Sequence, residues 1–258
     1  MIRFEEILAS KREEVDQLKR TIPLSALEEQ SKHSSPLRNF SAALRMEKIS
    51  IIAEIKRSSP SQGTLTEDFD HRAIAREYEQ GGAAALSVLT DRKFFQGDPS
   101  FIKEVREVST LPVLRKDFIL DEYQVFESRV ILADAILLIA RALNKTRLKN
   151  LYGLAQSLEL AVLLEVHDER DLAIANEMEA EIIGINNRDF WDYSVSLEHS
   201  LKLREAVHAK AIVISESGIR TGSDVARLAL AGFHGVLIGE SLMRTGNKIE
   251  ALKSLVKN

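Results

Sequence analysis

Lysines and glutamates stand at the ends of several short β-branched segments of this sequence. Glu54 and Lys56 lie at the end of the first segment, Lys116 at the end of the third and Glu165 at the end of the fifth. An ammonium group can donate a proton to a substrate or balance developing negative charge, and a carboxylate can accept a proton. Because Glu54 and Lys56 are two residues apart, they share one face of a strand. These residues therefore predict acid–base chemistry on a small molecule.

Polar residues also follow the later β-branched segments. Asn186 and Arg188 follow the sixth segment, and Glu216 and Ser217 follow the seventh. A single charge pair at the end of a strand can be an ion pair that closes the mouth of a barrel. Burying several ionised groups in one place is costly unless they satisfy one another or a ligand, so their number favours a functional site.

The segments that must position these residues alternate with longer stretches of helical periodicity. This alternation is typical of repeated βα units around a parallel sheet. The expected strands are residues 51–55, 84–89, 112–115, 135–139, 161–165, 182–185, 211–215 and 235–238. Eight of them predict an α/β fold, a closed (β/α)8 TIM barrel, with its chemistry on the loops after the strands. An open dinucleotide-binding sheet would need G-x-G-x-x-G after the first strand, where this sequence reads KRSSPSQG.

Two turns that contain glycine follow the seventh and eighth expected strands. They read SESGIRTGSD and IGESLMRTG. In many barrels these two loops donate backbone N–H groups to a phosphate, and glycine lets the backbone approach the anion closely or take a positive φ. Each turn by itself is equally consistent with a tight turn. Together they predict a phosphate site at Gly218, Gly239 and the amide of Glu240, with Ser59 and Arg188 as further contributors.

Loop phenylalanines and one histidine allow two interpretations each. An aromatic ring after a strand can hold a ring of the substrate or seal the edge of the core. We expect Phe118 to contact the substrate, and Phe94 and Phe95 to seal the core. His167 lies two residues after Glu165 and can reach the mouth, but a surface or capping role is the preferred interpretation.

The composition restricts the possible partners. The 35 basic and 39 acidic residues give a net charge of −4, which provides no basic surface for nucleic acid. Cysteine is absent, and the six histidines show no metal-ligand spacing, so we expect no disulfide and no metal site. No apolar run approaches the roughly 20 residues of a membrane span, and no signal peptide begins the chain. We expect a cytoplasmic monomer that binds a phosphorylated small molecule.

The 258 residues are expected to form one domain. Residues 49–258 would be the barrel, and residues 1–48 an N-terminal helical extension that contains helical stretches at 4–19 and 24–30. Such an extension can cap the bottom of a barrel or fold across its top. The sequence does not decide between these positions.

Seven segments, each at or beside an expected strand, resemble the indole-3-glycerol-phosphate synthase family. They are IIAEIKRSSPSQG (51–63), LSVLTDRKFFQGD (86–98), LPVLRKDFILDEYQV (111–125), LLEVHDERDL (163–172), IGINNRDF (183–190), ISESGI (214–219) and GVLIGESLMR (235–244). The stretch ILASKREEV resembles the N-terminal helical segment of that family. The resemblance implies a cofactor-free carboxy-lyase of tryptophan biosynthesis. It closes the ring of 1-(2-carboxyphenylamino)-1-deoxyribulose 5-phosphate to indole-3-glycerol phosphate, with loss of carbon dioxide and water.

The resemblance also implies roles for individual residues. Lys116 would be the general acid, and Glu165 would be its acid/base partner. Lys56 would hold the substrate carboxylate or assist acid catalysis, with Glu54 placed to orient it. Asn186 and Glu216 would hydrogen-bond the chain of the substrate. The expected substrate-binding residues are Ser59, Phe118, Asn186, Arg188, Glu216 and Ser217.

One segment departs from the family pattern. After Arg188 the chain reads DFWDYSVSLE, where leucine, then threonine and later aspartate would be more usual. The unusual residues Phe190, Asp192 and Ser196 lie beyond the catalytic segment, so we expect them to alter local packing and not activity.

Two other functions fit parts of the pattern. Phosphoribosylanthranilate isomerase is a barrel that binds phosphate in the same way, but it relies on a cysteine base. This chain has no cysteine. A non-catalytic barrel that binds a phosphorylated metabolite is the second alternative. It would have no chemical reason to place an acid such as Lys116 and a base such as Glu165 on opposing strands.

Overall fold

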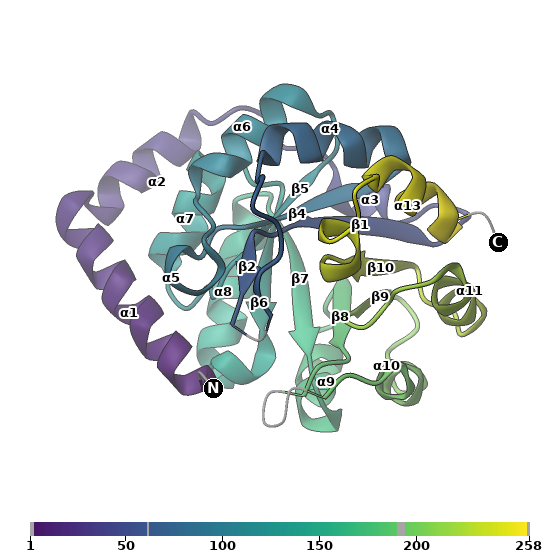
Figure 1. The fold of residues 1–258 in the computed structure, drawn as a ribbon. Helices are drawn as coiled ribbons and strands as arrows, with labels where there is room; N and C mark the ends of the chain where they lie inside the picture. The colour runs from purple at the N-terminus through teal and green to yellow at the C-terminus, as the bar shows by residue number, and fades with distance from the viewer. Residues whose placement is uncertain (1–2, 61, 190–193, 257–258) are drawn as a thin grey trace.

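The computed structural model describes residues 3–60, 62–189 and 194–256, and within them eight parallel strands close into a barrel (Figure 1). The strands are β1 Ser50–Ile55, β4 Ala85–Leu89, β5 Val113–Lys116, β6 Ala135–Ile139, β7 Ala161–Val166, β8 Ile182–Asn186, β9 Ile212–Glu216 and β10 Gly235–Ile238. They pair in chain order, and β10 pairs with β1 to close the barrel. The predicted TIM barrel is confirmed, and no strand end differs from its prediction by more than one residue.

Helices surround the barrel and connect its strands. They are α4 His71–Gly81, α6 Ser100–Val108, α7 Glu122–Val130, α8 Lys145–Ser157, α9 Glu169–Glu177, α10 Leu197–Arg204, α11 Gly222–Leu230 and α13 Lys248–Val256. Among the described residues, no helix is long and apolar enough to cross a membrane.

Local sequence signals fix where these helices begin and end. At the start of α4, the carboxylate of Asp70 accepts hydrogen bonds from the amides of Arg72 and Ala73. Gly82 follows this helix with φ 92°, and Gly232 follows α11 with φ 81°. Glycine takes this left-handed conformation without strain, so both helices stop where the chain must turn back toward the next strand.

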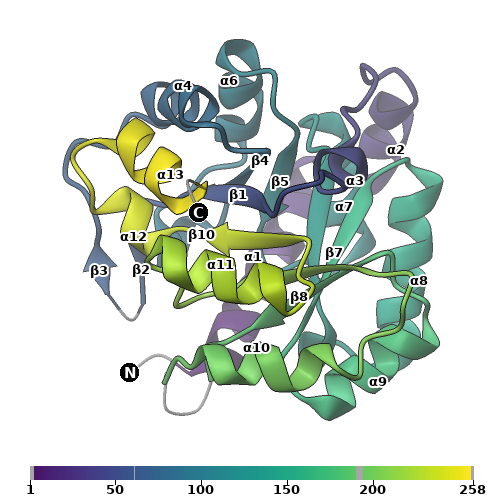
Figure 2. The ribbon, with the colours of Figure 1, turned by 90° about the vertical axis from the view of Figure 1, so that its right-hand side faces the viewer.

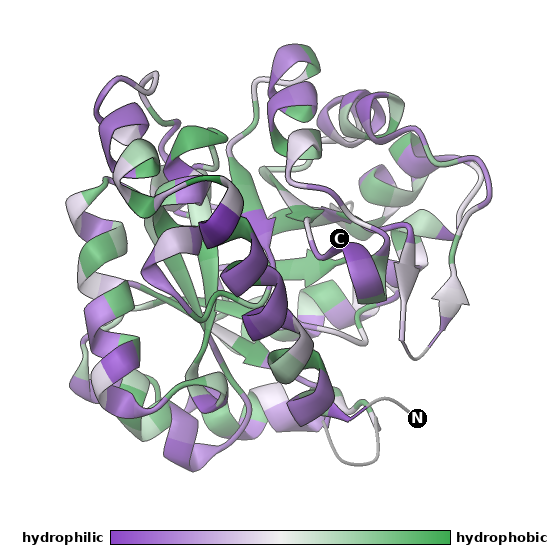
Figure 3. Ribbon diagram, turned by 90° about the vertical axis from the view of Figure 1, so that its left-hand side faces the viewer, coloured by the Kyte–Doolittle hydropathy of each residue, from purple (hydrophilic) through white to green (hydrophobic). Residues whose placement is uncertain are grey.

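Side chains alternate along each strand between the inside of the barrel and the surrounding helices. On β1, Ile51, Ala53 and Ile55 pack in the apolar layer under the helices, whereas Ile52 belongs to the cluster inside the barrel. Figure 3 shows this as largely hydrophobic strands at the centre, with hydrophilic residues on the outer faces of the helices. The alternation directs Glu54 of the same strand inward, next to the C-terminal end of the barrel.

The N-terminal extension contributes to both ends of the barrel. It consists of α1 Phe4–Thr21, α2 Leu24–Lys32 and α3 Phe40–Ala43. Phe40 and Leu44 are fully buried in the cluster inside the barrel, and α3 lies beside the start of β1 (Figure 2). At the opposite end, Phe4 and Ile7 of α1 line a cavity. The extension therefore both caps the bottom and walls the top.

Short elements that were not predicted fill the loops at the top. A hairpin of β2 Ser58–Ser59 and β3 Gly63–Thr64 follows β1, and helix α5 Arg92–Phe95 follows β4. The 3-10 helix Ala140–Ala142 follows β6, and helix α12 Glu240–Met243 follows β10. The hairpin and α12 lie together at the end of the barrel away from α3 (Figure 2). This end holds the predicted site.

Candidate active site

A cavity of about 570 Å³ opens at the C-terminal ends of the strands. All thirteen residues predicted for catalysis and binding line it. They are Glu54, Lys56, Ser59, Lys116, Phe118, Glu165, Asn186, Arg188, Glu216, Ser217, Gly218, Gly239 and Glu240. Because they come from six different strand ends and the loops beyond them, only the closed barrel brings them together.

Lys116 is at the centre of the charged groups in this cavity. Its Nζ lies 2.8 Å from Oε2 of Glu165 and 3.4 Å from Oε2 of Glu216. The lysine ends β5, and the two glutamates point inward from β7 and β9. Both carboxylates are almost fully buried, and Lys116 is 15% exposed. The ammonium of Lys116 therefore contacts two buried carboxyl groups and also faces the open part of the cavity.

Burial and neighbouring charges shift the pKa values of Lys116, Glu165 and Glu216 in different directions. Burial alone would lower the pKa of Lys116, but the carboxylates of Glu165, Glu216 and Glu54 raise it above its ordinary value. Burial raises the pKa of Glu216 to about 8, while the ammonium of Lys116 holds the pKa of Glu165 well below its ordinary range. At neutral pH the site therefore contains a charged lysine, an ionised Glu165 and a protonated Glu216.

The raised pKa of Glu216 predicts a dependence of stability on pH. The folded protein holds this proton more tightly than the unfolded chain, where the ordinary pKa is 4.5, so the unfolding free energy falls as the pH rises from there to about 8. The slope is at most about 1.4 kcal/mol per pH unit. Glu216→Gln lacks this titration and should lose less stability than the wild type between about pH 5 and about pH 8 in urea unfolding. Parallel pH profiles of the two proteins would contradict the prediction.

Lys56 and Glu54 form a second charged pair across the cavity. Lys56 Nζ lies 2.5 Å from Oε1 of Glu54, and both side chains are largely buried. This contact confirms the prediction that the two side chains share one face. Gly239 lies directly against Glu54, because a Cβ placed on this glycine would be 3.0 Å from Cδ and 3.2 Å from Cβ of that glutamate.

Substituting Gly239 therefore tests more than phosphate binding. Its φ of −123° is available to any residue, so a missing side chain, not a left-handed backbone, is what this position requires. Gly239→Val should displace Glu54 and lower kcat roughly tenfold or more, in addition to raising KM. Gly246→Val is the matched control, since nothing lies within 4 Å of a Cβ there. Steady-state kinetics that show an unchanged kcat for Gly239→Val would contradict this role.

Backbone turns and cations gather at the predicted phosphate site. Ser217 and Gly218 have φ of 69° and 81°, which directs the chain around the end of β9. Sequence reasoning missed Arg220 and Arg244, which also line the cavity. Both occur within the two glycine turns, so their position beside the glycines was the available signal. The carboxylate of Glu240 lies 3.5 Å from Nε of Arg244.

Three phenylalanines line the cavity and form what we call the aromatic wall: Phe4, Phe95 and Phe118. The ring of Phe118 lies between the other two, with centroid distances of 6.2 Å to Phe4 and 6.1 Å to Phe95. Phe118, which was predicted to contact the substrate, lines the cavity. Phe95, which was expected to seal the core, also lines the cavity, whereas Phe94 is not among the lining residues and has Lys93 Nζ over its ring at 5.3 Å.

His167 does not have the surface or capping role that the sequence suggested. It is 6% exposed, and its Nε2 lies 3.2 Å from Oε1 of Glu165. Burial lowers its pKa to about 4, so the imidazole is neutral at neutral pH. Its carbonyl is the hydrogen-bond partner of Nε2 of His199 at 2.7 Å. The ring therefore backs Glu165 on the side away from Lys116.

The segment that departs from the family pattern is only partly described. Phe190 and Asp192 lie outside the described residues. Ser196 immediately precedes α10, and its amide donates to the carbonyl of Asn187 at 3.3 Å. Asn187 also accepts from the amide of Ser200 through its side chain. Ser196 thus connects the end of β8 to the next helix.

Known proteins resemble the chain over almost its whole length. The profile of the indole-3-glycerol phosphate synthase family matches residues 4–255. The synthase of Chlorobium phaeobacteroides is 50% identical over 238 residues, which cover 92% of each chain. The synthase of Chromobacterium violaceum is 44% identical over 253 residues, which cover 96% of each chain.

Solved structures of lower identity share the fold. A 3-hexulose-6-phosphate synthase from Salmonella typhimurium has a TM-score of 0.66 at 12% identity, covering 81% of this chain and 97% of its own. A thiamine phosphate pyrophosphorylase from Pyrococcus furiosus has a TM-score of 0.61 at 18% identity, covering 84% and 96%. At these identities the likeness extends to the barrel alone.

Proposed function

Because this chain belongs to the indole-3-glycerol phosphate synthase family, we propose how its cavity carries out the family's reaction. The protein is a carboxy-lyase of tryptophan biosynthesis that closes the ring of 1-(2-carboxyphenylamino)-1-deoxyribulose 5-phosphate. One observation carries the proposal: a charged Lys116 and an ionised Glu165 are 2.8 Å apart at the base of the cavity. An acid and a base are thus held next to each other before substrate arrives.

Lys116 is the general acid in this proposal. Its ammonium donates a proton to the ketone oxygen of the substrate as the aromatic carbon that bears the carboxylate attacks the carbonyl carbon. The carboxylate then leaves the attacking ring carbon as carbon dioxide, and the electron pair of the broken C–C bond restores the aromaticity of the ring. The same groups complete the dehydration: the new hydroxyl leaves as water with a proton from a lysine, and Glu165 takes the proton from the adjacent carbon. The products are indole-3-glycerol phosphate, carbon dioxide and water.

Lys56 holds the carboxylate of the substrate until carbon dioxide leaves. Its contact with Glu54 supports this role, because the glutamate fixes the lysine in the cavity while the rest of the ammonium stays available to an anion. Asn186 and Glu216 lie on neighbouring strands at the same level and hydrogen-bond the hydroxyl groups of the substrate chain. A protonated Glu216 can donate as well as accept such a bond.

The phosphate binds on the side of the cavity formed by the loops after β9 and β10. The amides of Gly218, Gly239 and Glu240 approach it, and Ser59 and Arg188 contact it from the loops after the neighbouring strands β1 and β8. The remaining binding residue, Ser217, shapes the turn through its positive φ. The aromatic ring of the substrate lies on the aromatic wall, where offset or edge-to-face packing between rings is favourable.

We also propose that the enzyme acts as a cytoplasmic monomer. All the cavity residues named above come from one chain, which is what a monomeric enzyme requires.

The proposed function is tested by adding the purified protein to 1-(2-carboxyphenylamino)-1-deoxyribulose 5-phosphate and recording indole fluorescence. We expect the signal to rise in proportion to enzyme concentration and to be absent with heat-inactivated protein. A protein that binds the substrate without producing fluorescence would instead be a binding module. Titration with inorganic phosphate should inhibit the reaction competitively.

A further inference from the structure

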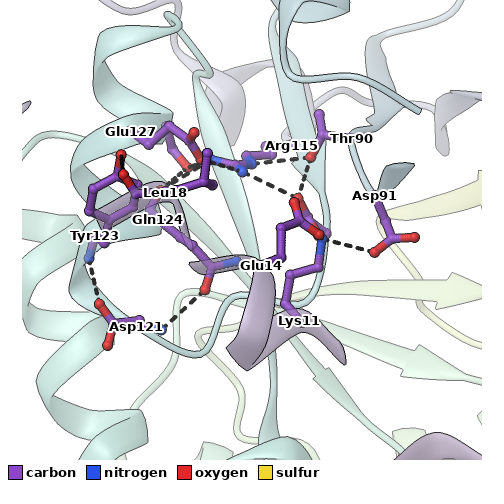
Figure 4. Close-up of polar contacts among 12 residues, drawn as sticks. Lys11, Glu14, Leu18, Thr90, Asp91, Arg115, Asp121, Tyr123, Gln124 and Glu127 are labelled. Carbon is purple, nitrogen blue, oxygen red and sulfur yellow. Dashed lines mark hydrogen bonds and ion pairs between the residues drawn. The ribbon is translucent and has the colours of Figure 1, made fainter. Parts of the chain in front are cut away.

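A fully buried lysine of helix α1 is held by carboxylates beside the active site. We call Lys11, Glu14, Asp91 and Asp117 the Lys11 cluster, of which Figure 4 labels Lys11, Glu14 and Asp91. Lys11 Nζ lies 2.8 Å from Oδ2 of Asp91, 3.0 Å from Oδ1 of Asp117 and 2.9 Å from Oε2 of Glu14. The lysine and both aspartates are at most 2% exposed at their side chains. A buried ammonium requires such partners, and Lys11 has three.

The two aspartates connect Lys11 to two separate loops of the cavity. Asp117 directly follows Lys116, and its Oδ1 also accepts a hydrogen bond from the amide of Phe118 at 2.8 Å. Asp91 caps the N-terminus of α5, and its Oδ1 accepts from the amide of Phe94 at 2.7 Å. Each carboxylate therefore accepts a hydrogen bond from the backbone of its own loop and also pairs with Lys11. Asp117 makes both contacts through Oδ1, whereas Asp91 contacts the backbone through Oδ1 and Lys11 through Oδ2.

The three pieces of chain that meet at Lys11 each supply one ring of the aromatic wall. Helix α1 carries Phe4, helix α5 carries Phe95, and the loop after β5 carries Phe118. The ring of Phe118 contacts both of the others, with centroid distances of 6.2 Å to Phe4 and 6.1 Å to Phe95. Their relative placement thus depends on what holds the pieces together, and Lys11 touches all three pieces.

A second set of contacts fixes the aspartate on the barrel side. Asp117 Oδ2 accepts from Oγ1 of Thr90 at 2.6 Å and lies 3.2 Å from Nη2 of Arg115. Arg115 is itself buried under the helices and paired with Glu127 at 2.6 Å (Figure 4). Asp117 is thus a fixed point of the barrel, and Lys11 positions helix α1 and α5 relative to it.

Attachment of helix α1 alone does not explain a buried lysine. The helix already buries Ile7, Leu8 and Val15, and Lys19 pairs with Asp121 at 2.8 Å nearer the surface. An apolar side chain often replaces a buried ion pair without loss of stability, whereas an ion pair with three partners fixes direction and distance. The Lys11 cluster therefore fixes the orientation of helix α1 relative to the barrel more tightly than an apolar contact would.

We propose that Lys11 is a positioning residue that sets the geometry of the aromatic wall, and with it the binding of the aromatic half of the substrate, by acting through Asp91 and Asp117. The inference rests on the proposed function, because it assigns the wall to the aromatic ring. The proposal predicts that substituting Lys11 weakens binding at the aromatic end of the ligand and not at its phosphate end. The phosphate end, on the loops after β9 and β10, is held by other residues.

Two inhibitors separate the ends of the ligand. Indole-3-glycerol phosphate carries the indole ring and the phosphate, and glycerol 3-phosphate carries the phosphate end alone. In Lys11→Met we expect the inhibition constant of indole-3-glycerol phosphate to rise about tenfold, the loss expected when a wall that orients a ligand is misplaced, and that of glycerol 3-phosphate to change less than about twofold. Lys19→Met, which removes the partly exposed ion pair of the same helix with Asp121, should leave both constants within about twofold of the wild type.

A general structural role would give a different result. If folded Lys11→Met weakens both inhibitors equally, or neither, the proposal is overturned. Asp91→Asn provides a milder lesion, because asparagine keeps the oxygen that accepts from Phe94 and loses the charge that pairs with Lys11. If Lys11→Met does not fold, the ratio of the two constants in Asp91→Asn decides, and a wild-type ratio there overturns the proposal. Failure of the proposed function would appear already in the wild type, as no inhibition by indole-3-glycerol phosphate, and the inference would fall with it.

Discussion

Lys116→Met is expected to lower kcat by on the order of 10² or more, the usual contribution of a general acid, while the barrel still folds. Methionine fills nearly the same space but provides neither the proton nor the positive charge that the developing oxyanion needs. The lysine acts mainly in the transition state, so KM should change much less than kcat. Indole fluorescence at saturating substrate measures the loss, and far-UV circular dichroism reports the fold.

The matched control for this variant is an exposed lysine near the same cavity. Lys93 Nζ donates a hydrogen bond to Oγ of Ser10 at the surface, at 2.9 Å. Lys93 is not among the residues that line the cavity. Lys93→Met should therefore keep wild-type kcat. A folded Lys116→Met with kcat within about threefold of the wild type would remove Lys116 from the role of general acid, since such a group contributes far more.

The catalytic groups were predictable because the barrel repeats a simple geometry. In a strand that points every second residue inward, a charged residue at the last inward position must reach the mouth, and Glu54, Lys116 and Glu165 all occupy such positions. The confirmed strand ends therefore located these side chains to within a residue. No distance was needed, because the closed barrel brings all its strand ends to one rim.

The residues that sequence reasoning missed depend on contacts between distant parts of the chain. Phe4 lines the cavity only because α1 crosses the top of the barrel, and that position depends on Lys11 meeting Asp91 and Asp117. No periodicity within α1 indicates which carboxylates its lysine will find. His167 was misjudged for a related reason, since it is buried and its carbonyl meets the ring of His199, 32 residues further along the chain.

Glycine illustrates a limit of a different kind. Gly218 and Gly239 look alike in the sequence as members of two turns, but only Gly218 has a positive φ. Gly239 is required because Glu54 of the neighbouring strand occupies the space of its side chain. A backbone requirement can be anticipated from a turn, whereas a steric requirement depends on the partner strand and its register.

Glu165→Gln should also lower kcat by on the order of 10² or more, because glutamine cannot take the proton that leaves during dehydration. The substitution keeps the shape of the side chain and an oxygen that accepts from Lys116. It also removes the first of the carboxylates that hold the pKa of Lys116 high, so the pKa of the lysine should fall. Loss of activity at high pH is then expected to begin at a lower pH in this variant than in the wild type.

Glu169→Gln is the control, since Glu169 pairs with Lys202 on the outer surface. It should keep both kcat and the pH profile of the wild type. A Glu165→Gln protein with full activity, or with the wild-type pH profile and only a raised KM, would show that Glu165 binds substrate without transferring a proton.

The double variant Lys116→Met with Glu165→Gln tests whether the two residues act as a unit. Residues in direct contact that complete the same dehydration do not contribute independently, so the double variant should lose about as much kcat as the worse single variant. The contact of 2.8 Å between Lys116 Nζ and Glu165 Oε2 is the physical basis for this expectation. Losses that multiply would instead mean that each residue lowers the same barrier independently of the other, and that their contact in the free enzyme serves only to neutralise buried charge.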